Sequence, residues 1–475
     1  MRVLYYSNYS HPTGLSFDSS WNLAVEFTKY ASRELKDEAF VMYLTKPKER
    51  GGLRGDEEQY IRNGNMILIE HEDSLTDGRL STFWVSTNLA EKLSRLEALD
   101  GGVKEPVVYN VLYHNTPYAI PALLALNRVA GHEGVPMVCR IDWFPSRSQV
   151  RSDRNISYLL VKLLQLYASV MPVLVHSKYC LKLMGIPENS EDAYTFLKWG
   201  IFYPPYDSEM VVKDKPVNSE PVIIFNHRIT GYTGFVHLVR ALQEIPPSYK
   251  FKIVLPESRV GSVRSSYSMK EERFIPSQLV DKKVYWKTIG RCDAVIGWHL
   301  PYGNGWSISI LEAVGSGCYP ITHYKSFYPE MLGGEGVLPE FEVSEEGLRD
   351  ALIYFLDNLE YCMKKARQLS GYVESRWSWK VQVKNWLGIL QKVIDSSYNM
   401  VFHGGGEGLT IKRLVEGRNV FRMSELIEHF ASRDKSGGRW NIGHKGTVFS
   451  DALRFLRKNG WRDKGGRDPL FVRGE

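Results

Sequence analysis

Short apolar runs alternate with helix-like segments along the first 395 residues, and this alternation constrains the fold more than any other feature. In the first half of the chain the strand-like runs are residues 2–8, 39–44, 65–70, 107–114, 135–141 and 172–176. Helical periodicity covers residues 21–31, 83–99, 118–130 and 156–171. Strands that alternate with helices predict a parallel sheet covered by helices on both faces.

A second alternating series follows a linker. Around residues 203–220 the composition turns to Pro, Asp, Lys and Ser with little apolar periodicity, which is typical of an inter-domain segment. Beyond it, strands are predicted at 222–226, 251–255, 294–296 and 319–322, with helices at 235–245, 285–291 and throughout 344–395. We therefore predict an α/β fold with two Rossmann-like domains facing each other across a cleft, at residues 1–205 and 220–398.

The stretch Asn304–Thr322 contains a glycine-bearing loop, a helix pattern and an apolar run, and it follows the strand-like residues 294–296. A helix that begins at the carboxyl end of a strand offers unpaired N–H groups to an anion, most often a phosphate. Glu312 lies between Leu311 and Ala313 on this helix, where a carboxylate is costly unless it has a partner. Hydroxyl groups of a ligand would supply that partner. The alternative is that the stretch is an ordinary βαβ element with an Asn-Gly turn.

The net charge is +6, and all of this excess lies in the last 75 residues, which hold 15 basic and 9 acidic side chains. After the glycine-rich tether 403–408, helix patterns at 423–430 and 447–458 precede a hairpin pattern that turns at Gly465-Gly466. This order predicts a small winged-helix-like α+β domain at residues 409–475. Its charge favours DNA as a partner, and the alternative is a protein-interaction domain on the same scaffold.

The five cysteines (139, 180, 292, 318 and 362) are scattered and form no CxxC pair, so we expect reduced thiols and no zinc site. The first residues are a strand too short for a signal peptide, and Lys162 and Gln165 interrupt the most apolar long segment, 158–175. We therefore expect a cytoplasmic protein with no membrane span.

Several motifs resemble the donor-binding domain of retaining GT-B glycosyltransferases, particularly family 4. They are Asn304-Gly305-Trp306-Ser307 followed by Glu312-Ala313, and Phe225-Asn226-His227-Arg228 followed by Thr233-Gly234. In the first domain, Val173 to Lys178 resembles the family's strand that ends in Ser. The resemblance covers residues 1–395 and is most specific around 222–240 and 293–335.

The resemblance implies a retaining transfer of a hexose or pentose from a nucleotide-diphosphate sugar, with Arg228 on the diphosphate and Glu312 on the ribose. Thr233 replaces the family's diphosphate-binding Lys and Asn304 replaces its first Glu, so Lys325 is a candidate substitute cation. No Asp-x-Asp motif is present, so neither a metal nor another cofactor is implied. The predicted donor-binding residues are Arg228, Thr233, Asn304, Gly305, Trp306, Ser307, Glu312 and Lys325.

Parallel sheets bind ligands outside the carboxyl ends of their strands, which places the acceptor candidates of the first domain. His114 and Asp142 are the candidate catalytic residues, because either group could take a proton or orient the acceptor. His11, Gly14 and Arg140 are the other acceptor-side candidates.

The acceptor that the basic tail suggests is a hydroxylated base in DNA, flipped into the cleft. Two alternatives remain open. One is a glycosyltransferase acting on a cell-surface glycan or small molecule with a protein-binding tail. The other is a non-catalytic DNA-binding regulator that senses a nucleotide sugar.

Overall fold

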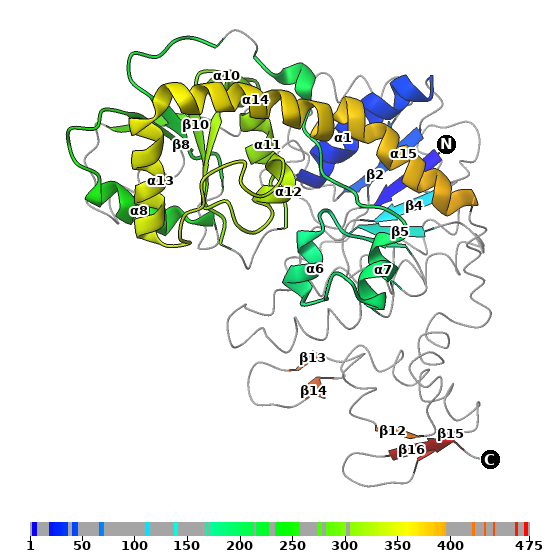
Figure 1. Cartoon of the computed structure of the whole chain (residues 1–475). Coiled ribbons are helices and arrows are strands. Elements are labelled where there is room, and N and C mark those ends of the chain that lie inside the picture. The colour runs from blue at the N-terminus through cyan, green and yellow to red at the C-terminus, as the bar shows by residue number, and fades with distance from the viewer. Residues whose placement is uncertain are drawn as a thin grey trace.

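The structure is a computed structural model of the whole chain (Figure 1). It describes residues 2–6, 19–36, 40–45, 66–70, 111–114, 137–140, 165, 168, 172–212, 215–227, 233–256, 273–277, 282–300 and 305–395. Five short strands beyond residue 395 are also described.

The described strands of the first lobe form a six-stranded sheet, and each is parallel to its neighbours. They are β1 (Arg2–Tyr6), β2 (Phe40–Thr45), β3 (Met66–Glu70), β4 (Val111–His114), β5 (Met137–Arg140) and β6 (Val173–Leu174). Their order, β3-β2-β1-β4-β5-β6, is that of a Rossmann sheet, whose direction of winding reverses between β1 and β4. Helix α1 (Ser19–Glu34) follows β1, and the short helices α6 (Tyr179–Met184) and α7 (Glu191–Leu197) follow β6.

The second lobe contains a five-stranded parallel sheet with the same winding. Its strands are β7 (Val222–Ile224), β8 (Lys252–Pro256), β9 (Phe274–Ser277), β10 (Ala294–Gly297) and β11 (Tyr319–Thr322). Their order is β11-β10-β7-β8-β9, so the winding reverses between β7 and β10. The accompanying helices are α8 (Phe235–Glu244), α10 (Lys282–Ile289), α11 (Ile308–Gly315), α12 (Tyr328–Leu332) and α13 (Glu345–Asp357). The prediction of two Rossmann-like lobes is confirmed.

The chain returns to the first lobe through the last two of the described helices (Figure 1). Helix α14 (Leu359–Trp377) packs on α11 and α12, whereas α15 (Trp379–Asp395) packs on α1. Ser378 separates the two helices, and the backbone beside it is fixed to the linker. Tyr206 N donates to Trp377 O at 3.1 Å, and Trp379 N donates to Tyr206 O at 3.0 Å. The linker and the α14–α15 break therefore form one structural unit at the lobe junction.

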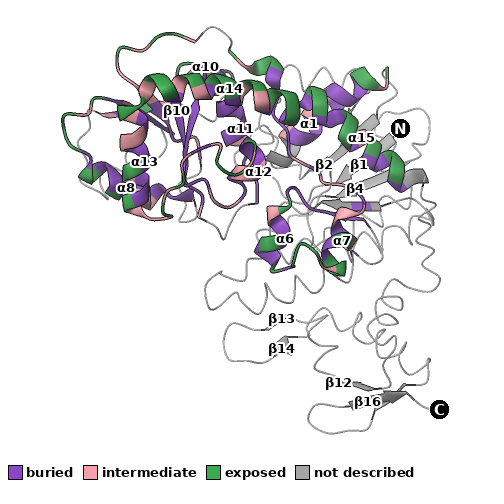
Figure 2. Cartoon of the chain, in the orientation of Figure 1, coloured by how far each residue is buried: buried purple, intermediate pink, exposed green. Residues whose placement is uncertain are grey.

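Apolar burial explains why α15 belongs to the first lobe. Its Trp379 and Trp386 are fully buried against Phe27 of α1, with ring centroids 6.2 Å and 5.7 Å from the phenylalanine ring. The buried faces of α1 and α15 meet in Figure 2, while their outer faces are exposed. Burying large aromatic rings is worth roughly 1.5–3 kcal/mol for each side chain, so this packing holds α15 against α1.

The described C-terminal strands are β12 (Val420–Arg422), β13 (Ser432–Arg433), β14 (Trp440–Asn441), β15 (Trp461–Asp463) and β16 (Leu470–Arg473). Strands β15 and β16 pair antiparallel, as the predicted hairpin requires, and β12 pairs with the other edge of β16. The turn predicted at Gly465-Gly466 lies outside the described residues. The helices predicted at 423–430 and 447–458 lie outside the described residues, and the winged-helix-like domain stays a prediction. No helix in the described ranges is both long and apolar enough to cross a membrane.

Candidate functional site

The reversal in the second sheet locates the candidate site. Ligands of such sheets bind beyond the carboxyl ends of the strands where the winding reverses. Asn226 and His227 follow β7, and His299 follows the neighbouring strand β10. Helix α11, which comes after β10, begins at the same end of the sheet. These side chains and the start of α11 therefore surround one position.

Among the described residues, no side chain caps the N-terminus of α11. Ser307 is the N-cap residue, yet its hydroxyl lies 3.1 Å from the Ser309 hydroxyl and makes no capping hydrogen bond. The first N–H groups of a helix lack intrahelical acceptors, and together they carry partial positive charge. Ser307 is itself buried, so α11 presents an uncapped N-terminus inside the protein, where an anion is favoured.

A chain of hydrogen bonds joins this helix start to the end of β7. The Ser309 hydroxyl lies 2.9 Å from His227 Nδ1, and His227 Nε2 lies 3.1 Å from the carbonyl oxygen of Ile296. Because a carbonyl only accepts, Nε2 carries the proton and Nδ1 accepts from Ser309. Burial lowers the pKa of His227 to about 4, so the ring is neutral at physiological pH.

Asn226 connects the same helix to α10. Its Nδ2 donates to Ser309 O at 2.8 Å and to the Tyr285 hydroxyl at 3.1 Å. Its Oδ1 is buried and has no hydrogen-bond partner among the described residues. A buried acceptor without a donor is costly, so this oxygen is suited to a hydroxyl or amide group of a ligand.

Glu312, the carboxylate that the sequence singled out, is buried and has partners within the protein. Tyr285 donates its hydroxyl to Oε2 at 2.5 Å, and Lys282 Nζ lies 3.3 Å from Oε1. Burial and the neighbouring carboxylate raise the pKa of Tyr285 well above its usual value, which keeps the hydroxyl protonated as a donor. Both carboxylate oxygens retain further lone pairs, so Glu312 can still accept from a ligand hydroxyl.

Gly305 lies where the two lobes touch. Ser177 of the first lobe donates its hydroxyl to Gly305 O at 2.6 Å. A Cβ atom at residue 305 would lie 2.5 Å from Cys180 Sγ and 2.9 Å from His176 Nε2. Only glycine allows this approach, so the first lobe supports the loop that leads into α11.

Trp306 is 4% exposed and its ring is used in packing. Its Nε1 donates to Pro204 O at 3.0 Å, and the ring lies 5.1 Å from that of Tyr203 and 5.2 Å from that of Trp377. Trp306 therefore anchors the loop to the linker.

The remaining described donor candidates lie on two different loops. Thr233 is buried and precedes Gly234, which has φ 75° and approaches the Trp298 carbonyl at the end of β10. Lys325 lies 3.7 Å from Glu342 and faces a hollow of about 370 Å³ lined mainly by residues 340–350. Thr233 is thus beside the candidate site, whereas the Lys325 ammonium is paired with the Glu342 carboxylate.

Five predicted residues lie outside the described ranges: His11, Gly14, Asp142, Arg228 and Asn304. His114 and Arg140 end strands β4 and β5, and His114 pairs in register with Tyr6 where the first sheet reverses its winding. Only their backbone is described. The sequence reasoning did not identify Lys282 and Tyr285, although the need of a buried carboxylate for partners was a signal that they exist.

No family model and no curated protein matches the chain. Sucrose-phosphate synthase from Thermosynechococcus elongatus is 11% identical, with a TM-score of 0.60 over 83% of this chain and 99% of that one. A glycosyltransferase from Rickettsia africae is 13% identical, with a TM-score of 0.56 over 83% and 98%.

A third similar structure is Anabaena HepE in complex with UDP-glucose. It is 13% identical, with a TM-score of 0.53 over 83% of this chain and 99% of that one. At these identities the likeness concerns the fold. The chain shares the two-lobed α/β fold of these proteins.

Proposed function

We propose that this protein is a glycosyltransferase that moves a sugar from a nucleotide-diphosphate sugar to an acceptor with retention of configuration. The observation that carries the proposal is the uncapped, buried N-terminus of α11 beside the polar side chains that follow β7. The shared fold supports it, because glycosyltransferases are among the similar structures and one of them is described as a complex with UDP-glucose.

In this proposal the diphosphate lies against the first turn of α11, between Gly305 and Ser307. Charge that develops on the departing nucleotide is stabilised there by fixed N–H dipoles, and Arg228 adds a charge-assisted fork. Thr233 contributes a hydroxyl. No metal ion is required in this scheme, because the dipoles and the guanidinium supply the neutralising charge.

Glu312 receives the ribose, and Asn226 offers its unpartnered Oδ1 to the nucleoside or the sugar. Tyr285 and Lys282 hold the Glu312 carboxylate in place before the donor arrives. A carboxylate that is already oriented loses little conformational entropy when it binds a ligand hydroxyl. Asn304 is the residue that we expect to select the donor sugar.

The acceptor that we propose is a hydroxylated base in DNA. The support is the location of the positive charge, since residues 401–475 carry the entire excess of six. His114 and Asp142 are the proposed residues that orient or deprotonate the acceptor.

The test is incubation of the full chain with a panel of nucleotide sugars and with DNA that includes hydroxymethylated bases, followed by nucleoside mass spectrometry. A base heavier by one hexose or pentose is the expected result. If sugar is transferred to water or to another acceptor while DNA is unchanged, the glycosyltransferase proposal stands and DNA is excluded as the acceptor. If no nucleotide sugar is bound or turned over, the proposal that the protein is a glycosyltransferase is contradicted.

Two point variants and one truncation sharpen this test. Glu312→Gln is expected to weaken donor use, whereas Glu335→Gln, at an exposed carboxylate on the second lobe, serves as the matched control. Deletion of residues 401–475 is expected to abolish DNA retention and preserve hydrolysis of the sugar donor. If the truncated chain retains DNA as well as the full chain does, residues 401–475 do not bind the DNA acceptor.

A further inference from the structure

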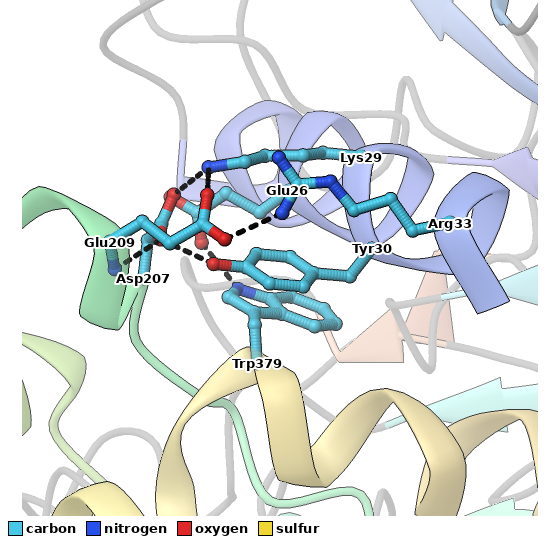
Figure 3. A network of polar contacts seen from close by, with 7 residues as sticks. All are labelled: Glu26, Lys29, Tyr30, Arg33, Asp207, Glu209 and Trp379. Atoms are coloured by element: carbon cyan, nitrogen blue, oxygen red, sulfur yellow. Dashed lines mark hydrogen bonds and ion pairs between the residues drawn. The ribbon is translucent and has the colours of Figure 1, made fainter.

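The linker between the lobes is fixed to the first lobe by a polar cluster (Figure 3). The members of this cluster come from α1, from the linker and from the start of α15: Glu26, Lys29, Tyr30, Arg33, Asp207, Glu209 and Trp379. Tyr30 donates to Asp207 at 2.6 Å, and Trp379 Nε1 donates to Glu26 at 2.5 Å. The linker and α15 are therefore both held on α1.

A separate contact joins the second lobe directly to the first. Glu330, on α12, accepts hydrogen bonds from the backbone N–H groups of Lys178 at 2.9 Å and Tyr179 at 3.2 Å, at the start of α6. Its Oε1 also accepts from the Tyr203 hydroxyl at 2.7 Å. A lysine ammonium has donors only, so Lys178, at the N-cap position, cannot itself accept from these N–H groups. A carboxylate of the second lobe therefore supplies the acceptor that the first turn of α6 needs.

The same turn of α6 also holds the loop that leads into α11. Ser177 donates its hydroxyl to Gly305 O at 2.6 Å, and Ser177 Oγ lies 3.1 Å from Cys180 Sγ. Cys180 is buried, and a Cβ atom on residue 305 would lie 2.5 Å from its sulfur. Residues 177–180 therefore contact the second lobe twice, through backbone groups at Glu330 and through side chains at Gly305.

Tyr203 provides a second connection from Glu330 to this loop. The centroid of the Tyr203 ring lies 5.1 Å from that of Trp306, the residue that follows Gly305. Burial and the charge of Glu330 raise the pKa of Tyr203, so its hydroxyl stays protonated as a donor to the carboxylate. Glu330 is thus connected to the loop before α11 by two routes, one through the first turn of α6 and one through Tyr203.

We propose that Glu330 is a positioning residue of the donor site: it holds the first turn of α6 against Gly305 and so fixes the loop that presents the start of α11. The inference rests on the proposed function. Three donors on one carboxylate require α6, α12 and the linker to keep one relative placement. A loop that is fixed before the donor arrives loses little entropy on binding, which raises affinity. Without Glu330 a smaller fraction of the molecules is competent to bind, and the measured Kd rises by that factor.

The test is isothermal titration calorimetry of the full chain with UDP-glucose, GDP-glucose, ADP-glucose and dTDP-glucose as probes. The variants are Glu330→Ala, Ser177→Ala and the double variant, which together form a double-mutant cycle. One control is Glu335→Ala, which removes an exposed carboxylate of the second lobe. The other is Glu209→Gln, which weakens the contact between the linker and α1 shown in Figure 3. This second control separates a general loss of stability at the linker from a loss of positioning.

Each single variant is expected to raise the Kd about tenfold, since hydrogen bonds of these kinds are worth about one factor of ten in affinity. The double variant is expected to bind within about threefold of Glu330→Ala, because Ser177 reaches Gly305 only while Glu330 holds α6 in place. Both controls are expected to keep the wild-type Kd.

A Kd about a hundredfold above wild type in the double variant would mean that the two contacts act independently, and it overturns this inference. A wild-type Kd in Glu330→Ala, or a tenfold rise in either control, also overturns it. All three results leave the proposed function intact. If none of the four probes binds to the wild type, the proposed function fails, and this inference falls with it.

A second variant keeps the test decisive if Glu330→Ala does not fold. Tyr203→Phe removes one donor to the carboxylate and keeps the ring beside Trp306. It is expected to raise the Kd about fivefold, and its effect is expected to be smaller when Ser177→Ala is already present. Full multiplication of the two effects, or a wild-type Kd in Tyr203→Phe, overturns the inference.

Discussion

Replacement of Gly305 by alanine tests whether contact between the lobes shapes the donor site. The new Cβ would lie 2.5 Å from Cys180 Sγ and 2.9 Å from His176 Nε2, both in the first lobe. Non-bonded heavy atoms normally lie about 3.5–4.0 Å apart, so the loop and α6 must separate by about 1 Å. Overpacking of this kind costs about 1–3 kcal/mol. The separation also stretches the 2.6 Å hydrogen bond from Ser177 to the residue 305 carbonyl.

If the lobes move apart to relieve the overlap, the conformation that binds the donor is destabilised by the same free energy. The Kd for a nucleotide sugar is then expected to rise about 5- to 150-fold, measured by calorimetry. The control is Gly371→Ala on α14, where an added Cβ meets nothing within 4 Å and which should leave affinity unchanged. Wild-type affinity and an unchanged urea midpoint in Gly305→Ala would refute the idea that the first lobe supports this loop.

Two further predictions concern single contacts. Tyr285→Phe removes the hydroxyl that donates to Glu312, and urea unfolding should show a loss of about 1–3 kcal/mol, because a buried carboxylate loses a charge-assisted bond; unchanged stability would contradict this. Desolvation acts to raise the pKa of Glu209, but its bonds to Arg33 and Lys29 outweigh this and lower it from 4.5 to about 2. The resulting stability is present above pH 4.5 and is lost as pH falls toward 2, so Glu209→Gln should cost about 1 kcal/mol at neutral pH, after discounting for solvent screening, and nothing near pH 2. Equal stability of the variant and the wild type across this range would exclude the effect.

The parallel sheets could be predicted because their strands are continuous apolar runs. Residues 319–322 were predicted to the residue, and all four are buried in β11. Strand β9 (Phe274–Ser277) was missed, because only Phe274 of its four residues is buried and the preceding segment is rich in Ser and Arg. The strand is defined by backbone pairing with β8, which leaves no apolar pattern in the sequence.

The site could be predicted in part. The sequence indicated that α11 begins at the carboxyl end of a strand and that Glu312 requires partners. It did not indicate that Tyr285 and Lys282 are those partners, because they lie 27 and 30 residues away on a helix whose facing side depends on tertiary packing. Within Asn304–Thr322 the sequence did not show where the loop ends: α11 begins at Ile308, and the Trp306 indole anchors the preceding loop.

The lobe junction was beyond the reach of sequence reasoning for the same reason. Glu26 and Trp379 are 353 residues apart, and nothing in either local pattern indicates that they are in contact. The return of α15 to the first lobe brings them together.

The most direct test of the central claim is release of labelled sugar from a panel of nucleotide sugars by the wild-type chain and by Glu312→Gln. We predict that at least one nucleotide sugar is consumed by the wild type, that its sugar is transferred with the α or β configuration retained, and that Glu312→Gln consumes it more slowly. If no nucleotide sugar is bound or consumed by the wild type, the claim that the start of α11 is a donor site is contradicted.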